Sequence, residues 1–232
     1  MRRPSEIALF DAIDDGDALA VRRILKDNPT LVEVTDQFGS TPLMCAASSM
    51  ARTIDIIEAI LEAGADVNRQ TSEGSTALHC AIDVNGEANL NTEEIIRRLV
   101  KAGANLSLRQ HYGWTPLLKS VVAGTLIELK TLLAVGAHPN DTLPLDTLPA
   151  FNAGRTALMA AITNPAAEEM IESLLEAGAN PFARDLSGAS FLDYAESTLR
   201  ELDLRDSDSL DFHKKVQRCA EKVKEWVNRS HT

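Results

Sequence analysis

A short cassette recurs four times along the chain and constrains its fold more than any other feature. Each copy has a glycine, one variable residue and then Thr-Pro-Leu or Thr-Ala-Leu, followed by helical spacing and a closing Gly-Ala. The opening glycines are Gly39, Gly74, Gly113 and Gly154, and a degenerate fifth copy begins at Gly188. The intervals between them are 35, 39, 41 and 34 residues. Such a period predicts a stack of helical repeats.

The cassette also contains the signals that begin and end helices. A threonine directly before proline, such as Thr41 before Pro42, can cap a first helix with its hydroxyl while the proline occupies the first turn. The closing glycines are Gly64, Gly103, Gly136 and Gly178. Glycines there fit the left-handed residue that follows a second helix. Each copy therefore predicts two helices.

These residues resemble those of ankyrin-repeat proteins, whose repeat of about 33 residues is a β-turn followed by two helices. The resemblance implies an all-α repeat solenoid of stacked ankyrin helix-turn-helix repeats with β-hairpin fingers. We predict a single array over residues 1–232. Its segments are an N-terminal capping repeat (4–35), four repeats (36–71, 72–110, 111–152 and 153–187), and a degenerate repeat with a C-terminal capping helix (188–232).

Both ends of the array are predicted to be caps. The inner side of the N-terminal cap is predicted from its apolar residues, Ile7, Phe10, Val21, Ile24 and Leu25. On the last helix an apolar stripe is formed by Phe212, Val216, Cys219, Val223, Trp226 and Val227. We expect this stripe to pack against the last repeat, since steps of three and four place it on one face. Binding of a partner helix is the alternative.

Additions distinguish the copies from one another. Repeat 72–110 has extra residues at 84–92, where Asn91 and Glu94 resemble a capping box. In repeat 153–187, Asn164 and Pro165 predict the N-cap and the first position of the second helix. Repeat 111–152 has a long finger loop at 139–150. This loop either presents apolar groups to a partner or binds nothing, because loops tolerate added length at little entropic cost.

The net charge of −11 is spread over all segments. Because nucleic acids and anionic membranes are bound by basic surfaces, neither is expected as a ligand. A basic protein partner would be attracted over long range, although a solubilising surface explains the same charge. The first residues do not resemble a signal peptide, and no window approaches 18 apolar residues. We therefore expect a cytoplasmic protein that is a monomer when unbound.

Catalytic motifs are missing from the sequence. The five histidines follow no HExxH pattern, and there is no Walker loop, dinucleotide fingerprint or nucleophile elbow. We therefore expect neither enzymatic activity nor a cofactor or metal site. His79 stands at the Thr-x-Leu-His position, where the resemblance implies a structural role for the imidazole.

The resemblance places partner binding on the concave side, which the fingers and the first helices form. Variable positions there include Gln37, Ser48 and Ser49. The sequence at 111–114, His-Tyr-Gly-Trp, stands out because tyrosine and tryptophan are enriched at binding hot spots. Packing of these two rings on the loop at 139–150 is the alternative. The candidate partner-binding residues are Phe38, Glu73, Asp83, His111, Tyr112, Trp114, Phe151, Arg155 and Asn164.

The sequence thus predicts a non-catalytic protein–protein interaction module, an intracellular adaptor or inhibitor that binds a protein partner on its concave face. One alternative is an immunity- or antitoxin-like neutraliser of a basic toxin or enzyme. Another is a recruiting subunit of an enzyme assembly. Self-association through the C-terminal helix or the long loop is a third possibility.

Overall fold

The protein folds into paired helices joined by turns. A computed structural model describes residues 3–49, 51, 53–82, 91–143, 154–201 and 207–230. The chain divides into two compact units, residues 1–111 and residues 112–232. The single array predicted for the whole chain stays a prediction.

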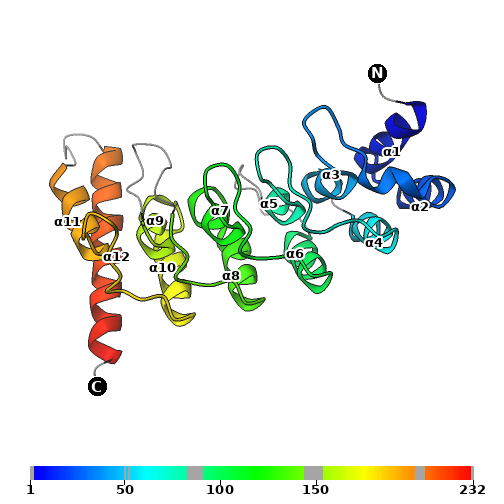
Figure 1. The fold of residues 1–232 in the computed structure, drawn as a ribbon. Coiled ribbons are helices and arrows are strands. Elements are labelled where there is room, and N and C mark those ends of the chain that lie inside the picture. The colour runs from blue at the N-terminus through cyan, green and yellow to red at the C-terminus, as the bar shows by residue number, and fades with distance from the viewer. Residues whose placement is uncertain are drawn as a thin grey trace. The chain divides into compact units, whose positions relative to one another are not determined.

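In the first unit, residues 1–111, helices pack in two rows (Figure 1). Its elements are α1 (Pro4–Asp14), α2 (Ala18–Asp27), the 3-10 helix η1 (Pro29–Glu33), α3 (Pro42–Ser48), α4 (Ile54–Glu62), α5 (Ala77–Ala81) and α6 (Thr92–Lys101). One row holds α1, α3 and α5, and the other holds α2, α4 and α6. Each first helix packs on the first helix of the next pair, so the repeats of this unit are stacked as predicted.

The second unit, residues 112–232, repeats this arrangement. Its elements are α7 (Pro116–Ala123), α8 (Leu126–Ala134), α9 (Ala157–Ala160), the 3-10 helix η2 (Ala161–Thr163), α10 (Ala167–Glu176), α11 (Phe191–Glu201) and α12 (Ser207–Ser230). The row of first helices is α7, α9 and α11, while α10 packs on both α8 and α12. The helical repeat fold predicted from the cassette is therefore present in both units.

The predicted helix signals are confirmed at the ends of the helices. The hydroxyls of Thr41, Thr76, Thr115 and Thr156 each accept a hydrogen bond from the backbone N–H three residues later. The closing glycines all have left-handed backbone, with φ between 92° and 100°. His79 is fully buried, and its Nδ1 accepts from the Thr76 N–H, so its role here is structural.

The fingers differ from the predicted β-hairpins. In the finger at 36–40 the Asp36 N–H donates to the Ser40 carbonyl, and in the finger at 71–75 the Thr71 N–H donates to the Ser75 carbonyl. No strand pair extends these turns within the described residues, apart from a single bridge between Thr142 and Thr156. The fingers are thus short turns and not extended hairpins, because each makes only a few backbone hydrogen bonds before the next helix begins.

An asparagine ladder, which was not predicted from the sequence, joins successive repeats. Asn68 lies four residues after a closing glycine, and its amide donates to the Gly103 carbonyl while its oxygen accepts from the Asn105 N–H. Asn140 makes the same two bonds to Gly178 and Asn180. Each ladder residue therefore fixes the spacing between one closing turn and the next.

Two predicted helix starts are wrong in detail. Asn91 precedes α6, but its backbone is left-handed and its side chain makes no capping hydrogen bond. The second helix of repeat 153–187 begins at Ala167 rather than at Pro165. Residues 164–166 form a turn first, in which the Asn164 Oδ1 accepts from the Ala166 N–H and the Asn164 carbonyl accepts from the Ala167 N–H. The Asn164 amide donates to the Val121 and Gly124 carbonyls and so ties this turn to α7.

The N-terminal cap is a pair of helices, and one residue predicted to lie on its inner side is exposed. Phe10, Val21 and Leu25 are buried as predicted, whereas Ile7 is 45% exposed. Leu9 and Ile13 are fully buried. The buried face of α1 is therefore rotated away from Ile7, because α1 packs on both α2 and α3.

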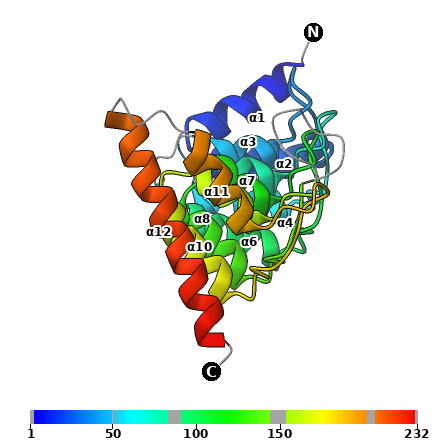
Figure 2. The ribbon, with the colours of Figure 1, turned by 90° about the vertical axis from the view of Figure 1, so that its left-hand side faces the viewer.

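Helix α12 lies against α10 and α11 (Figure 2). The apolar stripe on α12 packs against the last repeat, as predicted. Val216, Cys219 and Val223 are fully buried where α12 meets α10 and α11. Ion pairs flank this contact, with Arg218 bound to Glu168 at 2.7 Å and Lys222 bound to Glu172 at 3.0 Å. Burial, with the nearby Glu168, raises the pKa of the Cys219 thiol to about 11. Cys219 thus acts as an apolar core residue.

Among the described residues, no helix combines the length and the apolar character needed to span a membrane.

Candidate protein-binding surfaces

A hollow of about 450 Å³ opens in the first unit between α1, α3 and the finger at 36–40. It lies on the side formed by a finger and first helices, which is the side that the resemblance assigns to partners. The lining residues are Phe10, Asp14, Asp36, Gln37, Cys45, Ser48 and Ser49. We call this site the acidic hollow, since Asp14 and Asp36 are its charged residues.

Asp36 is held in place by the finger that it begins. Its Oδ1 accepts from the N–H groups of Phe38 and Ser40 at 2.7 and 2.8 Å. Its Oδ2 accepts weakly from the Cys45 thiol at 4.0 Å. The carboxylate is therefore oriented by the fold, and its charge lies at the wall of the hollow. Asp14, on the last turn of α1, is exposed.

Only part of this hollow could be predicted from the sequence. Gln37, Ser48 and Ser49 were identified from their places in the repeat. Asp14 was missed because it comes from the capping repeat, which lacks the cassette, and Phe10 was predicted only as an apolar residue on the inner side of that cap. The signal that could have found Asp14 is its position at the end of the first helix of the cap, where the other repeats carry variable residues.

An aromatic pair marks the second unit. The rings of Tyr112 and Trp114 lie 5.5 Å apart, with an angle of 40° between their planes. Tyr112 is 47% exposed and Trp114 is half-buried just before α7. The pair therefore presents a broad amphipathic surface beside a first helix. The alternative packing on the loop at 139–150 involves residues 144–150, which lie outside the described residues.

Three further candidates lie on fingers of the first unit. Phe38 is 73% exposed at a finger tip. Glu73 and His111 are exposed and adjacent, because the His111 N–H donates to the Glu73 carbonyl at 2.6 Å. Asp83 and Phe151 lie outside the described residues.

The remaining two candidates are occupied within the fold. The guanidinium carbon of Arg155 lies 3.9 Å from the centre of the Tyr194 ring, in a cation–π contact that joins a finger to α11. Asn164 is only 5% exposed, and its amide is used by the carbonyls of Val121 and Gly124. Both residues therefore hold repeats together, which leaves little of Asn164 for a partner.

Comparison with known proteins identifies the family. The family model for ankyrin repeats in three copies matches residues 9–90 and 86–185. These matches cover well over half of the chain, so the protein belongs to the ankyrin-repeat family. Ankyrin repeats are protein–protein interaction modules.

Curated relatives match through their ankyrin regions. Inversin of Gallus gallus is 35% identical over 103 residues, which are 44% of this chain and 9% of inversin. Ankyrin repeat and SAM domain-containing protein 6 of Rattus norvegicus is 32% identical over 115 residues, which are 49% of this chain and 12% of that protein. The chain thus spans a small part of these relatives.

Solved structures match over nearly the whole chain. A chain in the complex of a predatory endopeptidase from Bdellovibrio bacteriovorus with an immunity protein has a TM-score of 0.64 and 25% identity, covering 91% of this chain and 97% of that one. An ankyrin repeat domain from Acinetobacter baumannii has a TM-score of 0.66 and 26% identity, with coverages of 91% and 96%. The ankyrin domain of Bcl-3, at 23% identity and a TM-score of 0.69, shares the fold.

Proposed function

We propose that the protein is a non-catalytic adaptor or inhibitor that binds a protein partner through its fingers and first helices. The observation that carries this proposal is the aromatic pair Tyr112 and Trp114, of which Tyr112 is 47% exposed. Two neighbouring rings at the surface bury a large area on contact at a small cost in conformational entropy, which is why such residues dominate interfaces.

Loss of the aromatic pair is expected to weaken partner binding strongly. The double variant Tyr112→Ala/Trp114→Ala should lose one specific protein in affinity purification from the source cell, as identified by mass spectrometry. With that protein purified, calorimetry should show affinity reduced by about 30-fold or more, since a hot-spot side chain contributes about 2 kcal/mol or more.

Leu19→Ala is the matched control for this experiment. Leu19 is an apolar side chain on α2 that is 81% exposed, and α2 belongs to the row of second helices. Its removal should leave the captured protein and its affinity unchanged. A double variant that keeps the circular dichroism spectrum of the wild type and full affinity would refute the proposed surface.

A second candidate function, the neutraliser of a basic toxin or enzyme, is supported by the acidic hollow. Its two carboxylates can receive a lysine or arginine of a partner, because Asp36 is oriented by the finger and Asp14 is exposed. The net charge of −11 would steer such a partner toward the chain. The likeness to a chain of the endopeptidase and immunity protein complex agrees with this role.

Neutralising the hollow should slow association with a basic partner. In the variant Asp14→Asn/Asp36→Asn the amide oxygen introduced at position 36 can still accept from the finger N–H groups, so the fold is kept while two charges are lost. Stopped-flow measurements with the purified partner should give a lower association rate and a weaker dependence on salt. An association rate that is insensitive to salt in the wild type would exclude the neutraliser role and leave the aromatic pair as the binding surface.

A further inference from the structure

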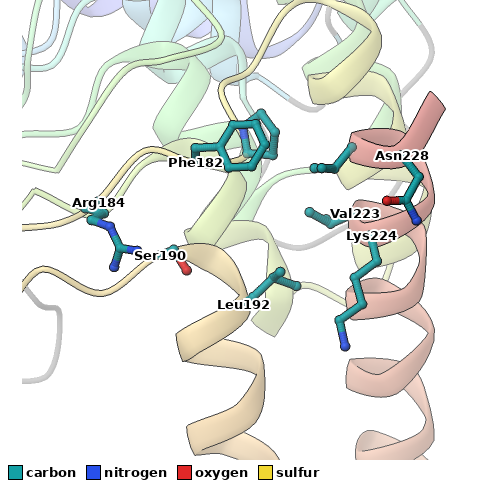
Figure 3. Close-up of a pocket in the computed structure, with 9 residues that line it drawn as sticks. Phe182, Arg184, Ser190, Leu192, Val223, Lys224 and Asn228 are labelled. Carbon is teal, nitrogen blue, oxygen red and sulfur yellow. The ribbon is translucent and has the colours of Figure 1, made fainter. Parts of the chain in front are cut away.

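A groove of about 520 Å³ lies in the second unit, where the last finger meets α11 and α12 (Figure 3). Its lining residues are Pro181, Phe182, Arg184, Ser190, Leu192, Val223, Lys224, Val227 and Asn228. We call it the terminal groove. Phe182, Leu192 and Val227 give it an apolar floor, and its volume lies within the range of about 300–1,000 Å³ that is typical of ligand sites.

Phe182 stands where two of the other repeats have a ladder asparagine. It follows the closing glycine Gly178 by four residues, as Asn68 follows Gly64 and Asn140 follows Gly136. Residues 189–232 contain no glycine, so they offer no closing Gly-Ala turn that an asparagine at 182 could bond. The ladder thus explains why asparagine is not needed there. It does not explain why the residue at this position is a phenylalanine whose ring is 58% exposed. Burying such a ring against a partner would be favourable.

The terminal groove is basic in an acidic chain. Its lining includes Arg184 and Lys224 and no carboxylate, although the chain has 34 acidic residues and a net charge of −11. Arg184 donates to the Gly188 carbonyl and lies 3.3 Å from Asp193, so it is fixed at the rim and partly neutralised. Lys224 is exposed on α12. Its ammonium group therefore favours a ligand with a negative charge.

We propose that the terminal groove binds a short segment of a partner protein in which a large apolar side chain lies next to a carboxylate. The apolar side chain packs on Phe182, Leu192 and Val227, and the carboxylate pairs with Lys224. A second copy of the chain is a poorer occupant, since two molecules of charge −11 repel each other. This site is separate from the aromatic pair and from the acidic hollow, so it does not depend on the function proposed for them.

Two capped peptides test this proposal on the full chain: acetyl-Glu-Leu-Phe-Asp-amide and its basic counterpart acetyl-Lys-Leu-Phe-Lys-amide. Titration followed by amide NMR should show the acidic peptide shifting resonances of residues 182–192 and 223–228 at millimolar concentrations. The basic peptide should bind several-fold more weakly, because it places ammonium groups beside Lys224.

Variants then separate the two parts of the groove. Phe182→Asn, which installs the ladder residue at an exposed position, should weaken the acidic peptide about tenfold. Lys224→Glu should reverse the preference between the two peptides. Lys214→Glu on the same helix lies outside the groove, and it should bind like the wild type.

Several outcomes would overturn the proposal. These are equal binding of the two peptides, no shifts at the groove, or unchanged binding in both Phe182→Asn and Lys224→Glu. Light scattering adds a further outcome. Self-association that Phe182→Asn abolishes would assign the groove to a second copy of the chain.

Discussion

Replacing Gly74 with alanine is expected to destabilise the protein by about 2 to 5 kcal/mol. Gly74 has a left-handed backbone with φ of +73°, in which an alanine costs about 1 to 2 kcal/mol. A Cβ atom built there would also lie 2.8 Å from the Arg109 carbonyl oxygen and 3.0 Å from the Gln110 Cα. Since both atoms belong to backbone, the neighbouring chain must move, which adds about 1 to 3 kcal/mol.

The backbone around Gly74 cannot easily yield. The Gln70 amide donates to both the Gly74 and the Arg109 carbonyls, at 2.7 and 3.1 Å. The His111 N–H donates to the Glu73 carbonyl on the other side of the glycine. A methyl group would therefore strain or break bonds that hold two consecutive fingers together. Faster hydrogen exchange at the His111 amide should accompany the loss of stability.

Gly39→Ala is the matched control for Gly74→Ala. Gly39 opens the preceding finger with φ of +79°, and no atom lies within 4 Å of a Cβ built there. Its substitution should cost only the backbone strain of about 1 to 2 kcal/mol. Urea denaturation followed by circular dichroism measures both variants. Equal losses of stability would show that the close approach at Gly74 has no energetic weight.

The helices could be predicted from the sequence because their signals are local. A threonine before proline caps the helix that follows it, and a glycine before alanine ends the helix that precedes it. Both effects depend only on residues within one turn of the chain. The α12 stripe was predicted for the same reason, since its spacing is a property of one helix. The role of the Asn164 amide could not be predicted in this way, because it donates to the Val121 and Gly124 carbonyls, which lie 43 and 40 residues earlier in the sequence.

The candidate surfaces could be predicted only in part. The cassette placed Tyr112 and Trp114 beside a first helix, and the structure brings their rings together. Arg155 was taken for a surface residue because its finger position is variable. Its ring partner, Tyr194, is 39 residues away in sequence. Contacts between repeats, including the terminal groove, depend on which side chain of one repeat meets which of the next, and the period does not specify this.

Asp185 is the buried carboxylate on which the last finger depends. It is 6% exposed, and its Oδ1 accepts from the N–H groups of Ser187 and Ala189 and from the Ser187 hydroxyl. Its Oδ2 accepts from the Tyr194 hydroxyl at 2.6 Å. Because Tyr194 also lies under the Arg155 guanidinium, this one carboxylate connects a finger, α11 and the preceding finger.

The charged form of Asp185 is stabilised in the folded protein. Burial alone would raise the pKa of this carboxyl, but the hydrogen bonds from Tyr194, Ser187 and Ala189 outweigh burial and lower its pKa to about 2. A folded-state pKa below the ordinary value of 3.8 means that ionisation favours folding. This contribution is complete above the unfolded pKa, and it is lost as the pH falls from about 4 through about 2.

Asp185→Ala is expected to lower the free energy of unfolding at pH 7 by about 2 to 4 kcal/mol, because the buried Tyr194 hydroxyl and the finger N–H groups lose their acceptor. Tyr194→Phe removes only one of these bonds, so it should cost less. Asp36→Ala is the control at the equivalent finger position. It too should cost less, because the bonds that this carboxylate accepts come from two finger N–H groups and, weakly, from a thiol.

The pH dependence distinguishes the charge of Asp185 from its shape. Asp185→Asn keeps an acceptor oxygen for the finger, so its loss of stability relative to the wild type should come mainly from the missing charge. Urea denaturation between pH 7 and pH 2 should show this difference shrinking as the pH falls below about 4, since the unfolded chain then takes up a proton at Asp185 that the folded carboxylate takes up only near pH 2. A difference that stays constant down to pH 2 would contradict the lowered pKa. Asp185 would then act through its shape and hydrogen-bonding geometry alone.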